Sequence, residues 1–161
     1  MPIYIKYGDI KGDVTAEGHK GSDGWVEVNS FQWGVGRGIS SPTGGSSDRE
    51  ASAPSVSEIT VTKTMDSTSP KLLQEALQGQ GTTVKIFFVD ILKNGTTRLY
   101  AEYDLSNVLI SGYSDSSGGD RPTESLSLNF TKVQYTFYTQ NPDGSTTASS
   151  TTYDLALGKV V

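Results

Sequence analysis

Few residues in this sequence could carry out chemistry. Its 161 residues include no cysteine and a single histidine, His19. Without cysteine the chain has no thiolate nucleophile, disulfide or Cys-ligated metal site. A Ser-His-Asp triad would have to use His19, because such triads need an imidazole to move the proton. His19 lies in a Gly- and charge-rich stretch typical of a loop, where we expect a solvated side chain and no catalytic residue.

Other patterns with a chemical meaning are weak. The run from Gly34 to Gly38 is glycine-rich but lacks the Lys-Ser/Thr ending and the following helix of a phosphate loop. Asp115 and Asp120 lie in a Gly/Ser-rich segment, and their number and spacing fall short of a calcium cage. A pair of carboxylates could still meet in space, but no pair is singled out. We therefore expect no enzyme, no cofactor and no metal.

Charge and hydropathy limit the partners. The formal net charge is −5, with no cluster of Lys and Arg, which disfavours nucleic acid and anionic membranes. No apolar run of about 18 residues could span a bilayer, and the N-terminus lacks a signal-peptide pattern. We expect a chain that folds in the cytoplasm, without membrane insertion, as one domain over residues 1–161.

The composition favours an all-β fold, since Gly, Ser and Thr are plentiful. Ile3–Tyr7 alternates with period two, as a strand does. In Trp25–Trp33 the apolar phase changes near Asn29-Ser30, and in Glu124–Gln140 it changes between Phe130 and Val133. Such changes let one bent strand serve two packing surfaces. They predict a compact β-barrel.

The remaining elements complete a barrel of about eight or nine antiparallel strands. Two hairpins are expected at Asn94-Gly95, as a type I′ turn, and at Asp143-Gly144. Strands are predicted at Ser55–Thr64, Val84–Leu92, Thr97–Tyr103, around Val108–Tyr113, and in a last run ending near Leu155.

One flanking α-helix is predicted at about 69–78. Ser69 is the expected N-cap, Pro70 the first helical residue, and Gly79 the left-handed residue that ends the helix. One apolar stripe should cover the β-structure, formed by Leu72, Leu73, Ala76 and Leu77.

A long extended loop is predicted at about 37–54. This Gly/Ser/Pro-rich stretch has almost no large apolar residue, and loops longer than ~12–15 residues are usually functional or disordered. It is either a floppy surface loop or an arm that docks on a neighbour, and the residues leave both readings open. Strand edges and such a loop suit a protein that works by self-association.

Four segments, in this order, resemble the Hcp family, which forms the inner tube of the type VI secretion system. They are Tyr7–Asp13, Trp25–Val35, Thr62–Leu72 and Glu124–Val133. The resemblance implies a β-barrel with a flanking helix, six copies in a ring, and rings stacked into a tube that carries effectors. It implies sheath and spike proteins as further partners, and export without a signal peptide. No toxin domain is expected after the tube domain.

The resemblance also suggests site residues. The stretch from Arg37 to Ala53 matches the family's extended loop, which reaches a neighbouring subunit or ring. Candidate contact residues there are Arg37, Ile39, Ser40, Asp48, Arg49 and Glu50. Gln32 points opposite to Phe31 and Trp33, in a region that faces the lumen in the family, so it is the candidate cargo contact.

Two other functions remain open on the residues alone. A phage-type tail-tube protein would share the tube architecture. A monomeric carbohydrate-binding β-sandwich would use exposed aromatic side chains such as Trp25 and Tyr113. A hydrolase that uses an unidentified carboxylate pair is a remote third alternative.

Overall fold

The computed structural model describes residues 2–16, 18–19, 21–40 and 50–161. As predicted, the fold is all-β, with an α-helix, α1 (Ser69–Gln78), and a short 3-10 helix, η1 (Gly21–Asp23). The strands are β1 (Ile3–Tyr7), β2 (Trp25–Val28), β3 (Ser30–Gln32), β4 (Val35–Gly36), β5 (Ile39–Ser40), β6 (Glu50–Ala51), β7 (Ser55–Val56), β8 (Ile59–Thr64), β9 (Thr82–Ile91), β10 (Thr97–Ser116), β11 (Thr123–Asn129), β12 (Lys132–Gln140), β13 (Thr146–Asp154) and β14 (Lys159–Val160).

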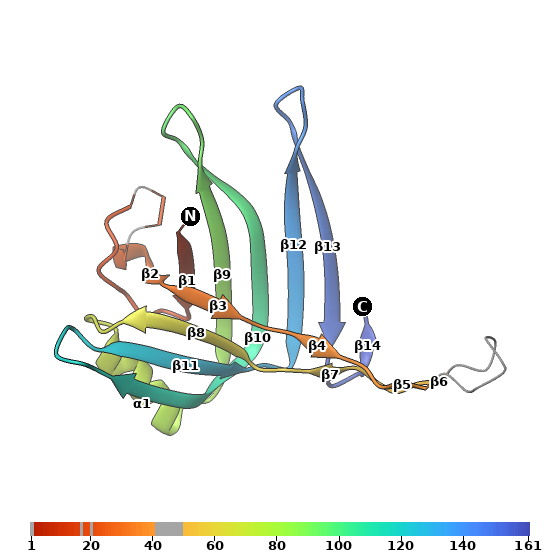
Figure 1. Cartoon of the computed structure of the whole chain (residues 1–161), viewed down its shortest axis with the longest axis horizontal. Helices are drawn as coiled ribbons and strands as arrows, with labels where there is room; N and C mark the ends of the chain where they lie inside the picture. The colour runs from red at the N-terminus through yellow and green to blue at the C-terminus, as the bar shows by residue number, and fades with distance from the viewer. Residues whose placement is uncertain (1, 17, 20, 41–49) are drawn as a thin grey trace.

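Two antiparallel sheets share the long strand β10 (Figure 1). The first half of β10 lies between β9 and β12, and this sheet continues through β1 to β2 on one side and through β13 to β14 on the other. The second half pairs with β11, followed by β8 and β3. The two sheets pack against each other but do not close into one barrel, because the first sheet ends at β13 and β14.

Both predicted phase changes mark places where the chain crosses between the sheets. β2 pairs with β1 in the first sheet, and β3, after Asn29, pairs with β8 in the second. β11 pairs with β8, and β12, after Phe130 and Thr131, pairs with β13. The change of apolar phase lets each crossing strand turn its other face toward the shared core.

The strands predicted at Thr97–Tyr103 and Val108–Tyr113 are one continuous strand, β10. Its pairing with β9 shifts register between Leu105 and Val108. Asn107 within this shift has a φ of 54°, a left-handed conformation that Asn tolerates better than most residues. The irregularity bends the strand without ending it, so β10 can pass from one sheet to the other.

Both hairpins are confirmed, but the type I′ turn predicted at Asn94-Gly95 is wrong. Gly95 has a φ of 84°, whereas Asn94 is not among the residues with positive φ, and type I′ needs positive φ at both positions. The N–H of Leu92 bonds the carbonyl of Thr96, which leaves a three-residue loop. The second hairpin repeats this geometry, with Gly144 at a φ of 89°.

Helix α1 has the predicted span but not the predicted ends. The N-cap is Thr68, because the Ser69 hydroxyl is used elsewhere: it donates to Glu124 and accepts the N–H of Asp66. Gly79 is extended, with φ −61° and ψ 150°, and not left-handed. The left-handed residue is Gly81, with a φ of 97°, where the chain turns into β9.

The predicted apolar stripe of α1 is only half buried. Leu72 is buried in the core and Ala76 is partly buried against it. Leu73 and Leu77 are exposed, the latter by 77%. The helix therefore covers the sheets with a narrower face than the pattern predicted.

The main core lies between the two sheets and α1. Its members come from both sheets, as expected for two layers around one core. They include Ile5, Tyr7, Val26, Val28, Ile59, Val61, Leu72, Val84, Ile86, Leu105, Val108, Ile110, Leu126, Leu128, Phe130 and Val133.

His19 is not the solvated side chain that its loop position predicted. Its ring stacks on Tyr4, with centroids 4.6 Å apart, and meets Trp25 edge-on at 4.9 Å. Burial in this aromatic cluster lowers the pKa of His19. The loop thus gains a second, small core on the outer face of the first sheet, where Tyr4, Trp25 and Val89 are buried.

Candidate functional site

Strands β4, β5, β6 and β7 form a two-stranded ribbon that extends away from the body of the molecule (Figure 1). β4 pairs with β7 and β5 pairs with β6. The long extended loop predicted at about 37–54 contains short paired strands in its described part, because Ile39 pairs with Ala51 and Ser40 with Glu50 through the backbone.

Side-chain hydrogen bonds fix the direction in which this ribbon extends. At its base, Trp33 Nε1 donates to the carbonyl of Ser57 at 3.0 Å. Further out, Arg37 Nε donates to the carbonyl of Ser52 at 2.9 Å, and the Ser52 hydroxyl accepts the N–H of Gly38. The ribbon is thus a defined arm whose route does not depend on packing against the body.

The arm exposes apolar side chains. Val35 is 53% exposed and Ile39 54% exposed. Apolar groups on a projecting segment are typical of a surface that another molecule covers. Among the candidate contact residues, Arg37, Ile39 and Ser40 lie on this arm, and Glu50 is paired to Ser40 through the backbone.

Asp48 and Arg49 lie outside the described residues, so the structure does not place them.

Gln32, the candidate lumen residue, is exposed in β3 and pairs with Thr60 of β8. It points away from Phe31, which packs on the aromatic side chains of the first sheet. Gln32 and the arm therefore belong to one continuous stretch of chain.

A second exposed surface lies on β10 and β12. We call it the aromatic face and define it as Tyr100, Tyr103, Tyr135 and Phe137. Tyr103 contacts Tyr135 at 4.7 Å between ring centroids, and Tyr100 contacts Phe137 at 6.4 Å.

The aromatic face is covered by the same chain only in part. Burial, with a smaller effect from Tyr135, raises the pKa of Tyr103 to about 12. Phe31 and Trp33 pack on Tyr103, whereas Tyr135 and Phe137 stay exposed by 36% and 41%. The second sheet is too short to reach them, so part of an apolar sheet face remains open.

A third surface is the outer edge of β13. Within the described strands this edge pairs only with β14, at Tyr153 and Asp154. Residues 146–151 are exposed on both faces and leave their outer backbone groups unpaired by any described strand. An open edge of this kind is a template for a strand from another chain.

The described residues hold no group of three or more potential His, Cys, Asp or Glu metal ligands. Nor does any helix described here have the length and hydropathy to cross a membrane.

The two aromatic side chains that suggested a carbohydrate-binding function are not available to a sugar. Trp25 is 9% exposed, and the Tyr113 hydroxyl donates to Glu124. The interpretation of these two side chains as an exposed sugar platform is therefore wrong. The exposed surfaces fit contacts between proteins better than a small-molecule site.

The comparisons with known proteins agree with this arrangement. The family described as "Type VI secretion system effector, Hcp" matches residues 4–137. This chain belongs to the Hcp family. Hcp is a family of type VI secretion proteins and not a family of enzymes.

Relatives match over most of the chain. Protein hcp1 of Pseudomonas aeruginosa is 28% identical over 146 residues, which cover 89% of this chain and 87% of that protein. A solved type six secretion system protein superposes with a TM-score of 0.83 at 27% identity, covering 99% of each chain. Hcp1 of Salmonella typhimurium has the same fold, with a TM-score of 0.74 at 21% identity over 99% of this chain and 98% of that one.

Two of the three surfaces escaped sequence reasoning. The sequence shows the change of apolar phase between Phe130 and Val133, but this pattern does not tell how far the second sheet extends over that face. The free edge of β13 depends on topology, and its Ser/Thr composition carries little signal. The arm was recognised from composition alone.

Proposed function

We propose that this chain is a tube subunit of the type VI secretion system, in which six copies close into a ring and rings stack around a lumen that carries effectors. The observation that carries the proposal is that one molecule leaves two surfaces uncovered, namely an arm with exposed Val35 and Ile39 and a partly open aromatic face. Membership of the Hcp family supports the same role.

The two surfaces complement each other between copies. The arm extends away from the body (Figure 1), and its side chains Val35 and Ile39 stay more than half exposed. A neighbouring copy can supply what each surface lacks, and repetition of one such heterologous contact closes a ring when the rotation fits. The free edge of β13 offers the neighbour backbone partners as well.

The other proposed partners follow from this role. Effectors would occupy the lumen and contact Gln32, and sheath and spike proteins would meet the assembled tube. The protein would fold in the cytoplasm and leave the cell as part of the tube. The role is structural and requires no catalytic residue, cofactor or nucleic acid.

The test replaces Ile39, 54% exposed on the arm, with aspartate. I39D should keep the fold and lower the fraction of rings measured by mass photometry, since it places a charge in an apolar contact. Leu77→Asp is the matched control, because it removes an exposed aliphatic side chain of α1 and adds the same charge. Equal ring fractions for I39D and L77D would refute the role of the arm.

A further inference from the structure

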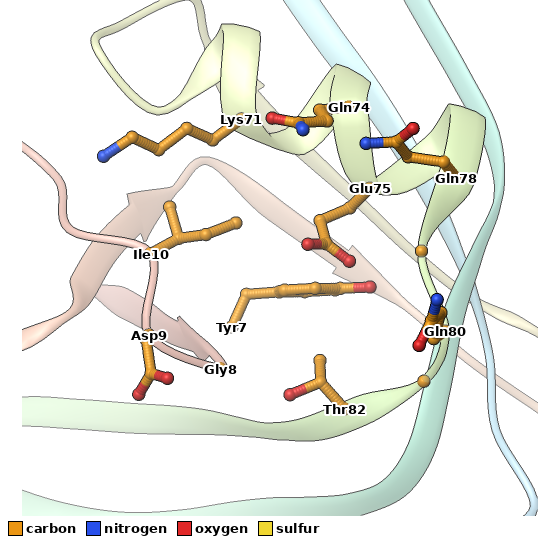
Figure 2. A pocket seen from close by; sticks show the side chains of 12 residues that line it. Tyr7, Gly8, Asp9, Ile10, Lys71, Gln74, Glu75, Gln78, Gln80 and Thr82 are labelled. Carbon is orange, nitrogen blue, oxygen red and sulfur yellow. The ribbon is translucent and has the colours of Figure 1, made fainter.

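A cleft beside helix α1 lies away from the three surfaces just described. Its volume is about 710 Å³, a size typical of ligand sites. Figure 2 shows its walls: one turn of chain after β1, the C-terminal half of α1, and the segment that leads into β9. The lining is mostly polar, with the side-chain amides of Gln74, Gln78 and Gln80 on one side.

Glu75 projects into this cleft without a compensating charge. No ion pair joins it to a described basic side chain. Lys71, one turn earlier, extends past Ile10 and away from the carboxylate (Figure 2). The carboxylate of Glu75 is also close to the end of the helix, since a Cβ added at Gly79 would lie 2.8 Å from its Oε2.

The position of this negative charge is electrostatically unfavourable. Carbonyl groups without helical partners give the C-terminal end of a helix a partial negative charge, which repels a carboxylate and attracts a cation. Asp9 adds a second carboxylate to the lining. Lys71 also lines the cleft, but its ammonium lies away from Glu75, so the end of the cleft at Glu75 favours a positively charged ligand.

Tyr7 supplies an independent observation. Its side chain is only 2% exposed and lies beneath the Glu75 carboxylate in Figure 2. Burial, and then the charge of Glu75, raise the pKa of Tyr7 to about 12, and no hydrogen bond to a described residue contributes to that shift. The nearly buried Tyr7 side chain thus forms one wall of the cleft, next to the carboxylate of Glu75.

We propose that this cleft binds a guanidinium group, as presented by an arginine side chain. A planar guanidinium has five donors, which can bond both Glu75 oxygens and the amide oxygens of the glutamines. A metal ion fits less well, because the described residues near the cleft include no cluster of three metal ligands. An anion is disfavoured by Glu75 and Asp9.

The experiment titrates the protein with N-acetyl-L-arginine methylamide and follows backbone amide shifts by NMR. The neutral citrulline analogue is the control ligand. We expect shifts confined to residues 7–10 and 74–82, with a Kd of about 1–10 mM, as for one small group. The citrulline analogue should bind at least about tenfold more weakly, since a charge-assisted hydrogen bond accounts for a decade of affinity.

Two protein variants complete the test. Glu75→Gln should weaken arginine binding about tenfold or more, whereas Glu27→Gln, an equal charge change outside the cleft, should not. A lower ring fraction for E75Q than for E27Q assigns the arginine to a neighbouring copy, and an equal fraction assigns it to a different protein. Equal binding of the arginine and citrulline probes, or equal affinities of E75Q and E27Q, would overturn the proposal whether or not the protein forms rings.

Discussion

The buried ion pair between Lys63 and Glu124 gives the most quantitative prediction. Lys63 Nζ lies 2.7 Å from Glu124 Oε1, and both side chains are fully buried. The hydroxyls of Ser69 and Tyr113 also donate to Glu124. The carboxylate thus ties β8, β11, β10 and the start of α1 together.

Removing one charge should be far more costly than removing both. Glu124→Leu leaves the Lys63 ammonium buried, with Asp66 at 2.9 Å as its remaining ion-pair partner. Loss of one partner of a buried pair costs about 3–5 kcal/mol, and the remaining Asp66 places our expectation near the lower value. The double variant K63M/E124L should recover much of this loss, because it leaves no buried unpaired ammonium and buries apolar groups. Asp66 loses its cation but is 21% exposed and keeps its hydrogen bonds from Thr68.

Urea unfolding, followed by the fluorescence of Trp25 and Trp33 at one protein concentration, measures these differences. A double-mutant cycle with K63M, E124L and K63M/E124L isolates the coupling. A loss of less than about 1 kcal/mol for E124L, or a double variant as unstable as the sum of the single ones, would refute the reasoning, since buried unpaired charges cost more than that.

Three further predictions concern pH, the arm and the lumen. Burial lowers the pKa of His19. Its contribution to the free energy of unfolding should therefore be complete above the unfolded pKa of about 6.5 and be lost as pH falls through the folded value. Urea unfolding of H19F should lack this pH dependence, and a pH profile equal to that of the unchanged protein would contradict the assignment. Deletion of residues 42–50 should preserve the circular dichroism spectrum but weaken ring closure or stacking in size-exclusion chromatography, and unchanged assembly would count against the arm. Gln32→Arg should keep rings yet alter co-purification of effectors, and unaltered cargo would exclude Gln32 from the lumen.

The sequence predicted the fold well wherever the signal was local. Alternation of apolar residues located the strands, and the phase changes at Asn29-Ser30 and after Phe130 marked the crossings between sheets. The ends of α1 were predicted less well, because Ser69 is used by the distant Glu124 and not as a cap. Tertiary hydrogen bonds of this kind leave no trace in local spacing.

The candidate site was predicted only in part, for the same reason. Composition identified the arm as a special segment but not its strand pairing, which involves residues far apart in the chain. His19 was misread because its partners Tyr4 and Phe87 come from two other strands. The exposure of Tyr135 and Phe137 depends on how far the second sheet extends, which no local pattern encodes.

Negative-stain electron microscopy of the purified protein tests the central claim most directly. The tube-subunit account predicts ring-shaped particles with sixfold symmetry at micromolar concentrations. Particles that remain monomers at every concentration tried would contradict it.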